Sequence, residues 1–292
     1  MDGVTAVEPR RFTGNLAVLK MRLRRRRVPR LALSAYPRIR IVWAGAALLA
    51  MLIALALIAG DSEAPRWARK LSPLVANLFR FVTDFGKSGW MLIPTGVFGL
   101  ILLFLADWSR IGRRMAAAWV EVGEICGFFF FNLAGAGMVT NIIKWTLGRS
   151  RPIRFREDGI LSFQPISFAY EHVSFPSGHA TTAAAAFAAC AYIFRGQPLV
   201  VGLVGLMAGV VAVSRVAVGA HFPSDVCAGV FIGASFTVIY AYALGRSGVA
   251  FQCLADGTLM PKTIAIRRIA DEAGPRAMLS GLWRALPGGS RR

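Results

Sequence analysis

The sequence predicts an all-α integral membrane protein in which six transmembrane helices form a bundle. Hydrophobic residues make up 55% of the 292 residues and charged residues only 17%, below the roughly 25% that is usual in soluble domains. Apolar stretches long enough to cross a bilayer recur along the chain. The formal net charge is nevertheless +19, and the basic residues cluster beside the apolar stretches. This arrangement favours charge at a membrane surface over nucleic-acid binding, so we expect no nucleic acid as a partner.

The six apolar spans justify the helix count. A transmembrane helix needs about 20 apolar residues, and the fourth span reaches that length only if it begins near Ser177. Glu121 and Glu124 lie at the start of the third span, where a helix N-terminus and the membrane interface tolerate acids. The spans lie at 41–60, 89–106, 116–142, 180–194, 199–218 and 226–244.

Polar segments flank this transmembrane domain of residues 41–244. Residues 1–40 form a basic tail that contains the run MRLRRRRVPR at 21–30, which we expect to bind anionic lipid head groups. The tail does not continue into a cleavable apolar segment, so we expect no secretory signal peptide. Residues 245–292 are expected to form a C-terminal tail.

The distribution of basic residues predicts the orientation. If the N-terminus is cytoplasmic, 23 of the 34 lysines and arginines lie on the cytoplasmic side and 11 on the other. Because cytoplasmic loops are enriched in lysine and arginine, we expect both termini in the cytoplasm and residues 143–179 and 214–225 on the outer face. The composition fits a bacterial inner membrane, whose outer face is periplasmic.

Between the first two spans, residues 66–82 predict an interfacial helix on the outer surface. The apolar side chains, from Trp67 to Val82, recur at helical spacing, and the basic residues fall largely on other faces. A simple loop is the alternative.

No metal or other cofactor is expected. The four cysteines show neither a CxxC pair nor a zinc-site spacing, and no carboxylate-rich or Cys/His cluster is present. We interpret Cys126, Cys190, Cys227 and Cys253 as reduced, three of them as packing residues inside apolar spans.

The first of three polar motifs on the outer face is KWTLGRSRP, which contains Lys144 and Arg151. Two helical turns would separate these cations by about 10 Å along an unbroken helix. Gly148 and Pro152 predict that the helix ends between them, so the second cation can fold back. Taken alone, the motif also fits ordinary interfacial cations.

The second motif is PSGH, residues 176–179, directly before the fourth span. Ser177 can cap the helix, Gly178 lets a ligand approach the backbone, and free N–H groups of the first turn favour an anion. A plain N-cap with an incidental His179 is the alternative.

The third motif is SRVAVGAHFPSD, which contains Arg215, His221 and Asp225. An unpaired guanidinium near the end of a membrane span is costly and usually functional. Pro223 suits the first turn of the sixth helix, and Asp225 in that turn can accept a hydrogen bond from one imidazole nitrogen of His221, leaving the other free to attack. A capping aspartate beside a surface histidine is the alternative.

Together, the motifs predict a metal-free phosphoryl-transfer pocket of cations, backbone N–H groups and a paired histidine. The spacing K-x6-RP, PSGH and SR-x5-H-x3-D resembles the type 2 phosphatidic acid phosphatase superfamily over residues 144–225, and six helices fit its membrane branch. The resemblance implies that His221 is the nucleophile that forms a phosphohistidine, that Asp225 orients it, and that His179 protonates the leaving oxygen. It also implies the residues that hold the phosphate: Lys144, Arg151, Ser177, Gly178 and Arg215.

The expected activity is therefore hydrolysis of a lipid phosphate monoester or diphosphate at the outer leaflet. Phosphatidic acid, phosphatidylglycerophosphate, undecaprenyl diphosphate and lipid A phosphates are the candidate substrates, and the 153–173 loop is expected to border the site and contribute selectivity. The alternatives are a lipid phosphotransferase with the same pocket, a non-catalytic anion-binding membrane protein, and vanadate-dependent halide oxidation, which the membrane spans disfavour.

Overall fold

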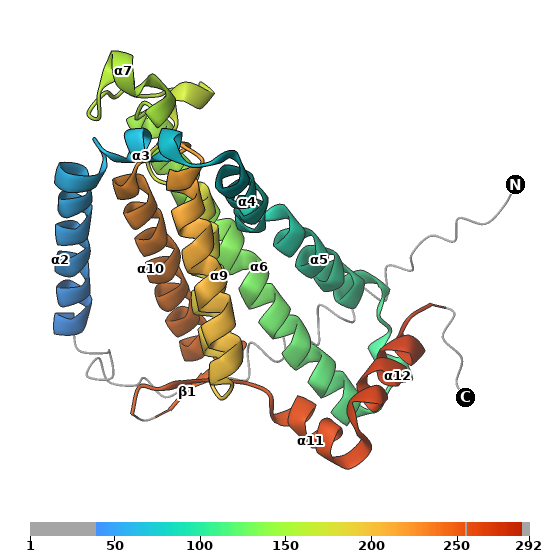
Figure 1. Cartoon of the computed structure of the whole chain (residues 1–292). Helices are drawn as coiled ribbons and strands as arrows, with labels where there is room; N and C mark the ends of the chain where they lie inside the picture. The colour runs from blue at the N-terminus through green and yellow to red at the C-terminus, as the bar shows by residue number, and fades with distance from the viewer. Residues whose placement is uncertain (1–38, 255, 288–292) are drawn as a thin grey trace, which may run out of the picture. The chain divides into compact units, whose positions relative to one another are not determined.

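The computed structural model describes residues 39–254 and 256–287, which are mostly helical, as predicted (Figure 1). The basic segment within residues 1–38 lies outside the described residues, so its binding to anionic lipids stays a prediction. The α-helices are α2 (Ile39–Leu55), α3 (Ala64–Lys70), α4 (Pro73–Thr83), α5 (Gly89–Leu100), α6 (Arg113–Leu147), α7 (Phe155–Asp158), α8 (Gly178–Ile193), α9 (Pro198–Ala217), α10 (Pro223–Ser247), α11 (Ile264–Ala273) and α12 (Pro275–Ala285).

Short 3-10 and π segments join or extend these helices. The π segments are η2 (Ala56–Gly60) and η4 (Ile101–Leu105), and the 3-10 segments are η3 (Asp84–Gly86), η5 (Trp108–Arg110), η6 (Pro152–Arg154) and η7 (Tyr170–His172). The sequence did not predict a small antiparallel hairpin of β1 (Phe251–Cys253) and β2 (Leu259–Pro261).

Four helical stretches are long and apolar enough to span a membrane: Pro73–Leu105, Arg113–Leu147, Pro198–Ala217 and Pro223–Ser247. They correspond to the second, third, fifth and sixth predicted spans. The first predicted span coincides with α2 and η2, of which Ala50–Gly60 is a shorter apolar helix. The fourth coincides with α8, which has 16 residues and so measures about 24 Å, less than the roughly 30 Å hydrocarbon core. The count of six transmembrane helices stays a prediction.

The predicted helix over 66–82 is divided between α3 and α4. The Ser72 hydroxyl accepts a hydrogen bond from the Val75 N–H at 3.4 Å, and Pro73 occupies the first turn of α4. A serine cap followed by proline is a typical helix start, so the apolar spacing continues across a break in the helix.

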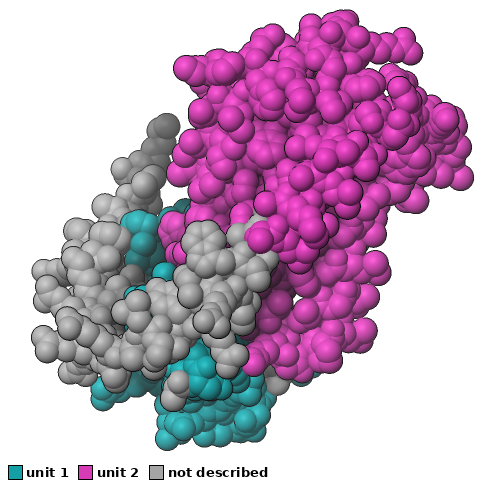
Figure 2. Space-filling model, turned by 90° about the vertical axis from the view of Figure 1, so that its left-hand side faces the viewer, with its two compact units in different colours: residues 1–31, 93–130, 241–292 teal, residues 32–92, 131–240 magenta. Residues whose placement is uncertain are grey.

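The chain divides into two compact units, coloured separately in Figure 2. Of the described residues, one unit contains 93–130, 241–254 and 256–287, and the other contains 39–92 and 131–240. All three polar motifs belong to the second unit. Within it, α8, α4 and α3 pack against α9.

In the first unit, the two acids at the start of the third span bind the C-terminal segment. Glu121 accepts hydrogen bonds from the backbone N–H groups of Ala265 and Ile266, at 2.9 and 3.1 Å, in the first turn of α11. Glu124 pairs with Lys262 at 3.0 Å. One carboxylate therefore accepts hydrogen bonds from the free N–H groups at a helix N-terminus, and the other neutralises a cation, both far along the chain.

Candidate active site

The first motif begins on α6 and continues beyond its end, as predicted. Lys144 lies in the last turn of α6, which ends at Leu147, and Gly148 has a φ of +62°. A Cβ at Gly148 would lie 1.6 Å from the Gln164 carbonyl oxygen, so only glycine fits this turn. The chain then reverses and places Arg151 beside the loop that follows.

The second motif forms the N-terminus of α8. Gly178 and His179 begin the helix, and Ser177 occupies the N-cap position. The predicted side-chain cap is not formed, because the Ser177 hydroxyl has no hydrogen-bond partner. The Ser177 backbone N–H instead donates to the Asp225 carbonyl oxygen at 2.9 Å, which joins the second and third motifs.

Lys144 reaches this helix N-terminus. Its ammonium nitrogen lies 3.7 Å from the position that a Cβ at Gly178 would occupy. The absence of a side chain at Gly178 therefore leaves the first backbone N–H groups of α8 open beside a cation. Such a combination favours a bound anion.

The third motif spans the turn between α9 and α10. Arg215 is buried at the end of α9 and donates to the Thr83 hydroxyl at 2.5 Å. His221 lies in the connection, and its backbone N–H donates to the Arg215 carbonyl at 3.2 Å. Asp225 occupies the first turn of α10, as predicted.

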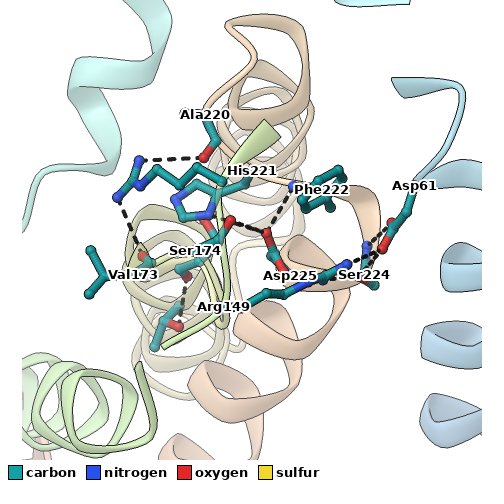
Figure 3. A network of polar contacts seen from close by, with 12 residues as sticks. Asp61, Arg149, Val173, Ser174, Ala220, His221, Phe222, Ser224 and Asp225 are labelled. Atoms are coloured by element: carbon teal, nitrogen blue, oxygen red, sulfur yellow. Dashed lines mark hydrogen bonds and ion pairs between the residues drawn. The ribbon is translucent and has the colours of Figure 1, made fainter. Parts of the chain in front are cut away.

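Asp225 is the centre of a buried polar network (Figure 3). Its Oδ2 accepts hydrogen bonds from the Ser174 hydroxyl at 2.6 Å and the Phe222 N–H at 2.9 Å. The His221 Nδ1 lies 3.6 Å from the same oxygen, just beyond hydrogen-bond distance. The two side chains are thus adjacent, and a small rotation of the imidazole would form the bond.

Arg149 and Asp61 belong to this network but were not predicted from the sequence. Arg149 donates to Asp225 Oδ1 at 2.5 Å and to Asp61 Oδ2 at 2.8 Å, and neither Arg149 nor Asp61 is exposed by more than 1%. The available signals were a second arginine, besides Arg151, inside the first motif and an aspartate directly after an apolar span. A charged group in these positions is costly unless it is paired.

Arg151 contacts the connecting loop, residues 153–173, whose contribution to selectivity stays a prediction. Its guanidinium donates to the Ala220 and Val173 carbonyls, both at 3.4 Å, and lies over the exposed Tyr170 ring at 3.9 Å from the centroid. A guanidinium stacked on an aromatic ring is held in orientation while its edge remains available for ligands.

The remainder of the loop is held by ion pairs. Arg154 contacts Asp158 at 2.8 Å and Glu171 at 3.0 Å, and the hydrogen bond from Arg154 lowers the pKa of Asp158. The Ser150 hydroxyl is 3.0 Å from His172 Nδ1. These contacts fix the loop beside Arg151.

The electrostatic surroundings connect the residues of all three motifs. Four groups act electrostatically on the partly buried His179: Arg215, His221, Lys144 and Lys87. Burial lowers the pKa of His221 to about 4, against the opposing effect of Asp225. His221 is therefore a neutral imidazole at neutral pH, the form that a nucleophile requires.

Several buried polar atoms of the described residues have no hydrogen-bond partner, and four of them belong to the motifs. They are Arg151 Nε, Ser177 Oγ, Arg215 Nε and His221 Nδ1. Buried polar groups are rarely left unsatisfied in proteins. His221 Nδ1 faces Asp225, whereas the other three atoms, one from each motif, indicate a site for a ligand rich in acceptor oxygens, such as phosphate.

Comparisons with known proteins agree with this chemistry. Residues 126–248, which include all three motifs, match the family model of the PAP2 superfamily. A lipid A 1-phosphatase of Rhizobium johnstonii is 35% identical over 208 residues, which cover 69% of this chain and 81% of the relative. A lipid A 1-phosphatase of Rhizobium etli is 33% identical over 69% of this chain and 85% of the relative.

A solved structure of a transmembrane PAP2-type phosphatidylglycerolphosphate phosphatase from Bacillus subtilis aligns with a TM-score of 0.41 at 16% identity, over 79% of this chain and 94% of that one. The motifs and the two curated relatives point to one family. The chain belongs to the PAP2 superfamily and is a membrane phosphatase of that superfamily.

Proposed function

We propose that this protein hydrolyses the 1-phosphate of lipid A through a phosphohistidine formed on His221. The observation that carries the proposal is a set of three buried atoms without partners, one in each motif, since a phosphate group would satisfy them: Arg151 Nε, Ser177 Oγ and Arg215 Nε. The named activity of two relatives that align with 69% of this chain favours lipid A over the other lipid phosphates.

The first step transfers the phosphoryl group to the enzyme. The neutral His221 attacks phosphorus through the nitrogen opposite Nδ1, and the bond from phosphorus to the leaving oxygen breaks. His179 gives a proton to that oxygen, so the lipid leaves as an alcohol. Asp225 accepts the Nδ1–H of His221 and stabilises the positive charge that develops on the ring.

The second step releases phosphate. Water attacks the phosphohistidine and gives a proton to His179, which restores both histidines. The charge on the phosphoryl oxygens is stabilised throughout by three cations, by the Ser177 hydroxyl and by the open N–H groups beside Gly178. The cations are Lys144, Arg151 and Arg215.

The orientation of the site is part of the proposal. We place the protein in the bacterial inner membrane, with both termini in the cytoplasm and the site facing the periplasm. The support is the excess of basic residues in the segments assigned to the cytoplasm, 23 of 34.

Phosphate release by the purified protein in detergent tests the function. The substrates are lipid A 1-phosphate, phosphatidic acid, phosphatidylglycerophosphate and undecaprenyl diphosphate, and His221→Ala is the control. We expect steady release of inorganic phosphate that is fastest from lipid A 1-phosphate and absent in the variant. Faster hydrolysis of another lipid would contradict the substrate, and transfer of phosphate to an added lipid acceptor without release would contradict hydrolysis.

A further inference from the structure

A chain of buried charges lies behind Asp225, on the side away from His221 (Figure 3). It runs from Asp225 through Arg149 to Asp61, and the three residues are between 0 and 1% exposed. The distances are 2.5 Å from Arg149 to Asp225 and 2.8 Å from Arg149 to Asp61. Asp61 follows the first apolar helix and is 88 residues from Arg149 in the sequence.

Every nitrogen of the Arg149 guanidinium has a partner. Besides the two aspartates, it donates to the Ile160 carbonyl from Nε and Nη2 and to the Ser224 hydroxyl from Nη1. Asp61 is held as well, by the Ser224 N–H at 3.0 Å and the Ser224 hydroxyl at 2.5 Å. The geometry of the cluster is therefore fixed from both ends.

The charges of the cluster do not cancel. Two carboxylates and one guanidinium carry a net charge of one negative unit, whereas Arg149 and Asp225 without Asp61 would be neutral as a pair. Attack by His221 makes its imidazole cationic. A compensating negative charge lowers the energy of that cation in a buried site, where charges interact strongly.

We propose that Asp61 is a positioning residue that acts through Arg149, so that Asp225 presents a full negative charge to His221 during phosphoryl transfer. The inference rests on the proposed role of His221 as the nucleophile. It assigns a function in catalysis to a residue that lies outside the three motifs.

The other charged groups around His221 make this compensation necessary. Lys144 and Arg151 act on its imidazole and oppose a positive charge there, and His179 interacts with it. The Arg215 carbonyl accepts the His221 N–H. Among the described residues, the ionisable groups that act on His221, apart from Asp225 and the cluster behind it, are thus cations or an imidazole. Asp61 itself also acts on the thiol of Cys227 in α10.

Three variants separate charge from structure: Asp61→Asn, Arg149→Gln and the double variant. The pKa of His221 is measured by NMR titration of histidine-labelled protein, which is tractable because the chain has three histidines. Asp61→Asn removes negative charge, so we expect the pKa to fall by about one unit and kcat to fall about tenfold, the equivalent factor. KM should be unchanged, because Asp61 is not among the phosphate-binding residues.

Arg149→Gln removes positive charge and should raise the pKa of His221 by a similar amount. The double variant has the net charge of the wild type, so the pKa should return to within about half a unit of the wild-type value. Glu124→Gln is the matched control, since it breaks another buried ion pair, with Lys262, and should leave both the pKa of His221 and kcat unchanged.

The proposal is overturned if Asp61→Asn folds and leaves the pKa of His221 unshifted. It is also overturned if Asp61→Asn and the control Glu124→Gln shift the pKa of His221 by the same amount. If Arg149→Gln does not fold, the titration and kcat of Asp61→Asn decide alone. The titration does not require turnover. If the predicted pKa shifts are found in a protein that forms no phosphohistidine, the proposed function is refuted and the charge coupling is still supported.

Discussion

His221 and His179 have different surroundings, and the difference matches the different roles proposed for them. His221 is 2% exposed at its side chain and faces Asp225, a partner that can orient it. His179 lies in the first turn of α8, near the 3-10 segment η3 and in the field of Lys87 and Arg215. Its position next to the residues proposed to bind phosphate brings the imidazole near the leaving oxygen, to which it would donate a proton.

Replacement of His179 should therefore cost activity according to the leaving group. General acid catalysis contributes a factor of about 10²–10⁴ to the rate. An aryl phosphate needs little of it, because its acidic phenol leaves readily without a proton. We expect His179→Ala to lose about that factor in kcat on a lipid phosphomonoester and much less on the aryl ester.

Parallel kinetics of His179→Ala and His221→Ala on both substrates check this prediction. His221→Ala should be inactive on both, because its loss removes the nucleophile. If His179→Ala loses the same factor on the lipid and the aryl ester, His179 binds or attacks phosphate and the division of roles is wrong.

The sequence predicted the candidate site residues that stand in the three motifs. It missed Asp61 and Arg149, which only the fold brings together. Lys144, Ser177, Arg215 and Asp225 stand in motifs whose spacing indicates a phosphate site. Asp61 stands in no such motif. Its place directly after an apolar span indicates a paired charge but not the partner, because Arg149 is 88 residues away and only the packing of separate helices joins them.

At the scale of elements, the contact between α8 and α10 sets the position of the second motif relative to the third. A Cβ at Gly229 of α10 would lie 2.4 Å from the Ser177 carbonyl, and one at Gly233 would lie 2.3 Å from the Thr181 carbonyl. Small residues that let two helix backbones approach closely are typical of membrane helix packing.

A methyl group at this contact should displace α8 together with Ser177 and His179. We expect Gly229→Ala to destabilise the protein by about 1–3 kcal/mol, the usual cost of overpacking, and to lower kcat as well. Gly202 and Gly209 of α9 supply the control, because a Cβ at either position meets nothing within 4 Å.

Thermal unfolding and kinetics in detergent check both kinds of variant. Alanine at Gly202 or Gly209 should leave the melting temperature and kcat nearly unchanged. If alanine at the α9 glycines lowers the melting temperature and kcat as much as Gly229→Ala does, the close contact between α8 and α10 does not position the site.

Element boundaries were predictable where glycine or proline ends or begins a helix. As predicted, α6 ends between Lys144 and Arg151, and Pro223 stands in the first turn of α10. The start of α8 at Gly178 meets the condition that the fourth span begin near Ser177. The hairpin and α11 were not predicted, although the apolar residues of α11 recur at helical spacing. Glu121 binds the α11 backbone and Glu124 binds Lys262, and both contacts join residues that are distant in sequence. Local periodicity does not report such contacts.

At the scale of the whole molecule, the proposed orientation places the α7 region in the periplasm and the C-terminal helices in the cytoplasm. A cysteine at Glu157, whose side chain is 69% exposed, should react with a membrane-impermeant maleimide in intact spheroplasts. A cysteine at the exposed Ser280 of α12 should react only after permeabilisation. Both are introduced into a chain in which the four native cysteines are replaced by serine. The reverse pattern would contradict the orientation.

Direct detection of a covalent intermediate tests the central claim, that His221 receives the phosphoryl group. The purified protein is mixed with substrate, quenched within milliseconds in alkaline denaturant, which preserves phosphohistidine, and digested for mass spectrometry. The account predicts a phosphorylated peptide with the modification on His221, accumulated further in His179→Ala with an aryl phosphate and absent in His221→Ala. Phosphate found on His179, or rapid turnover with no modified histidine at any quench time, would contradict it.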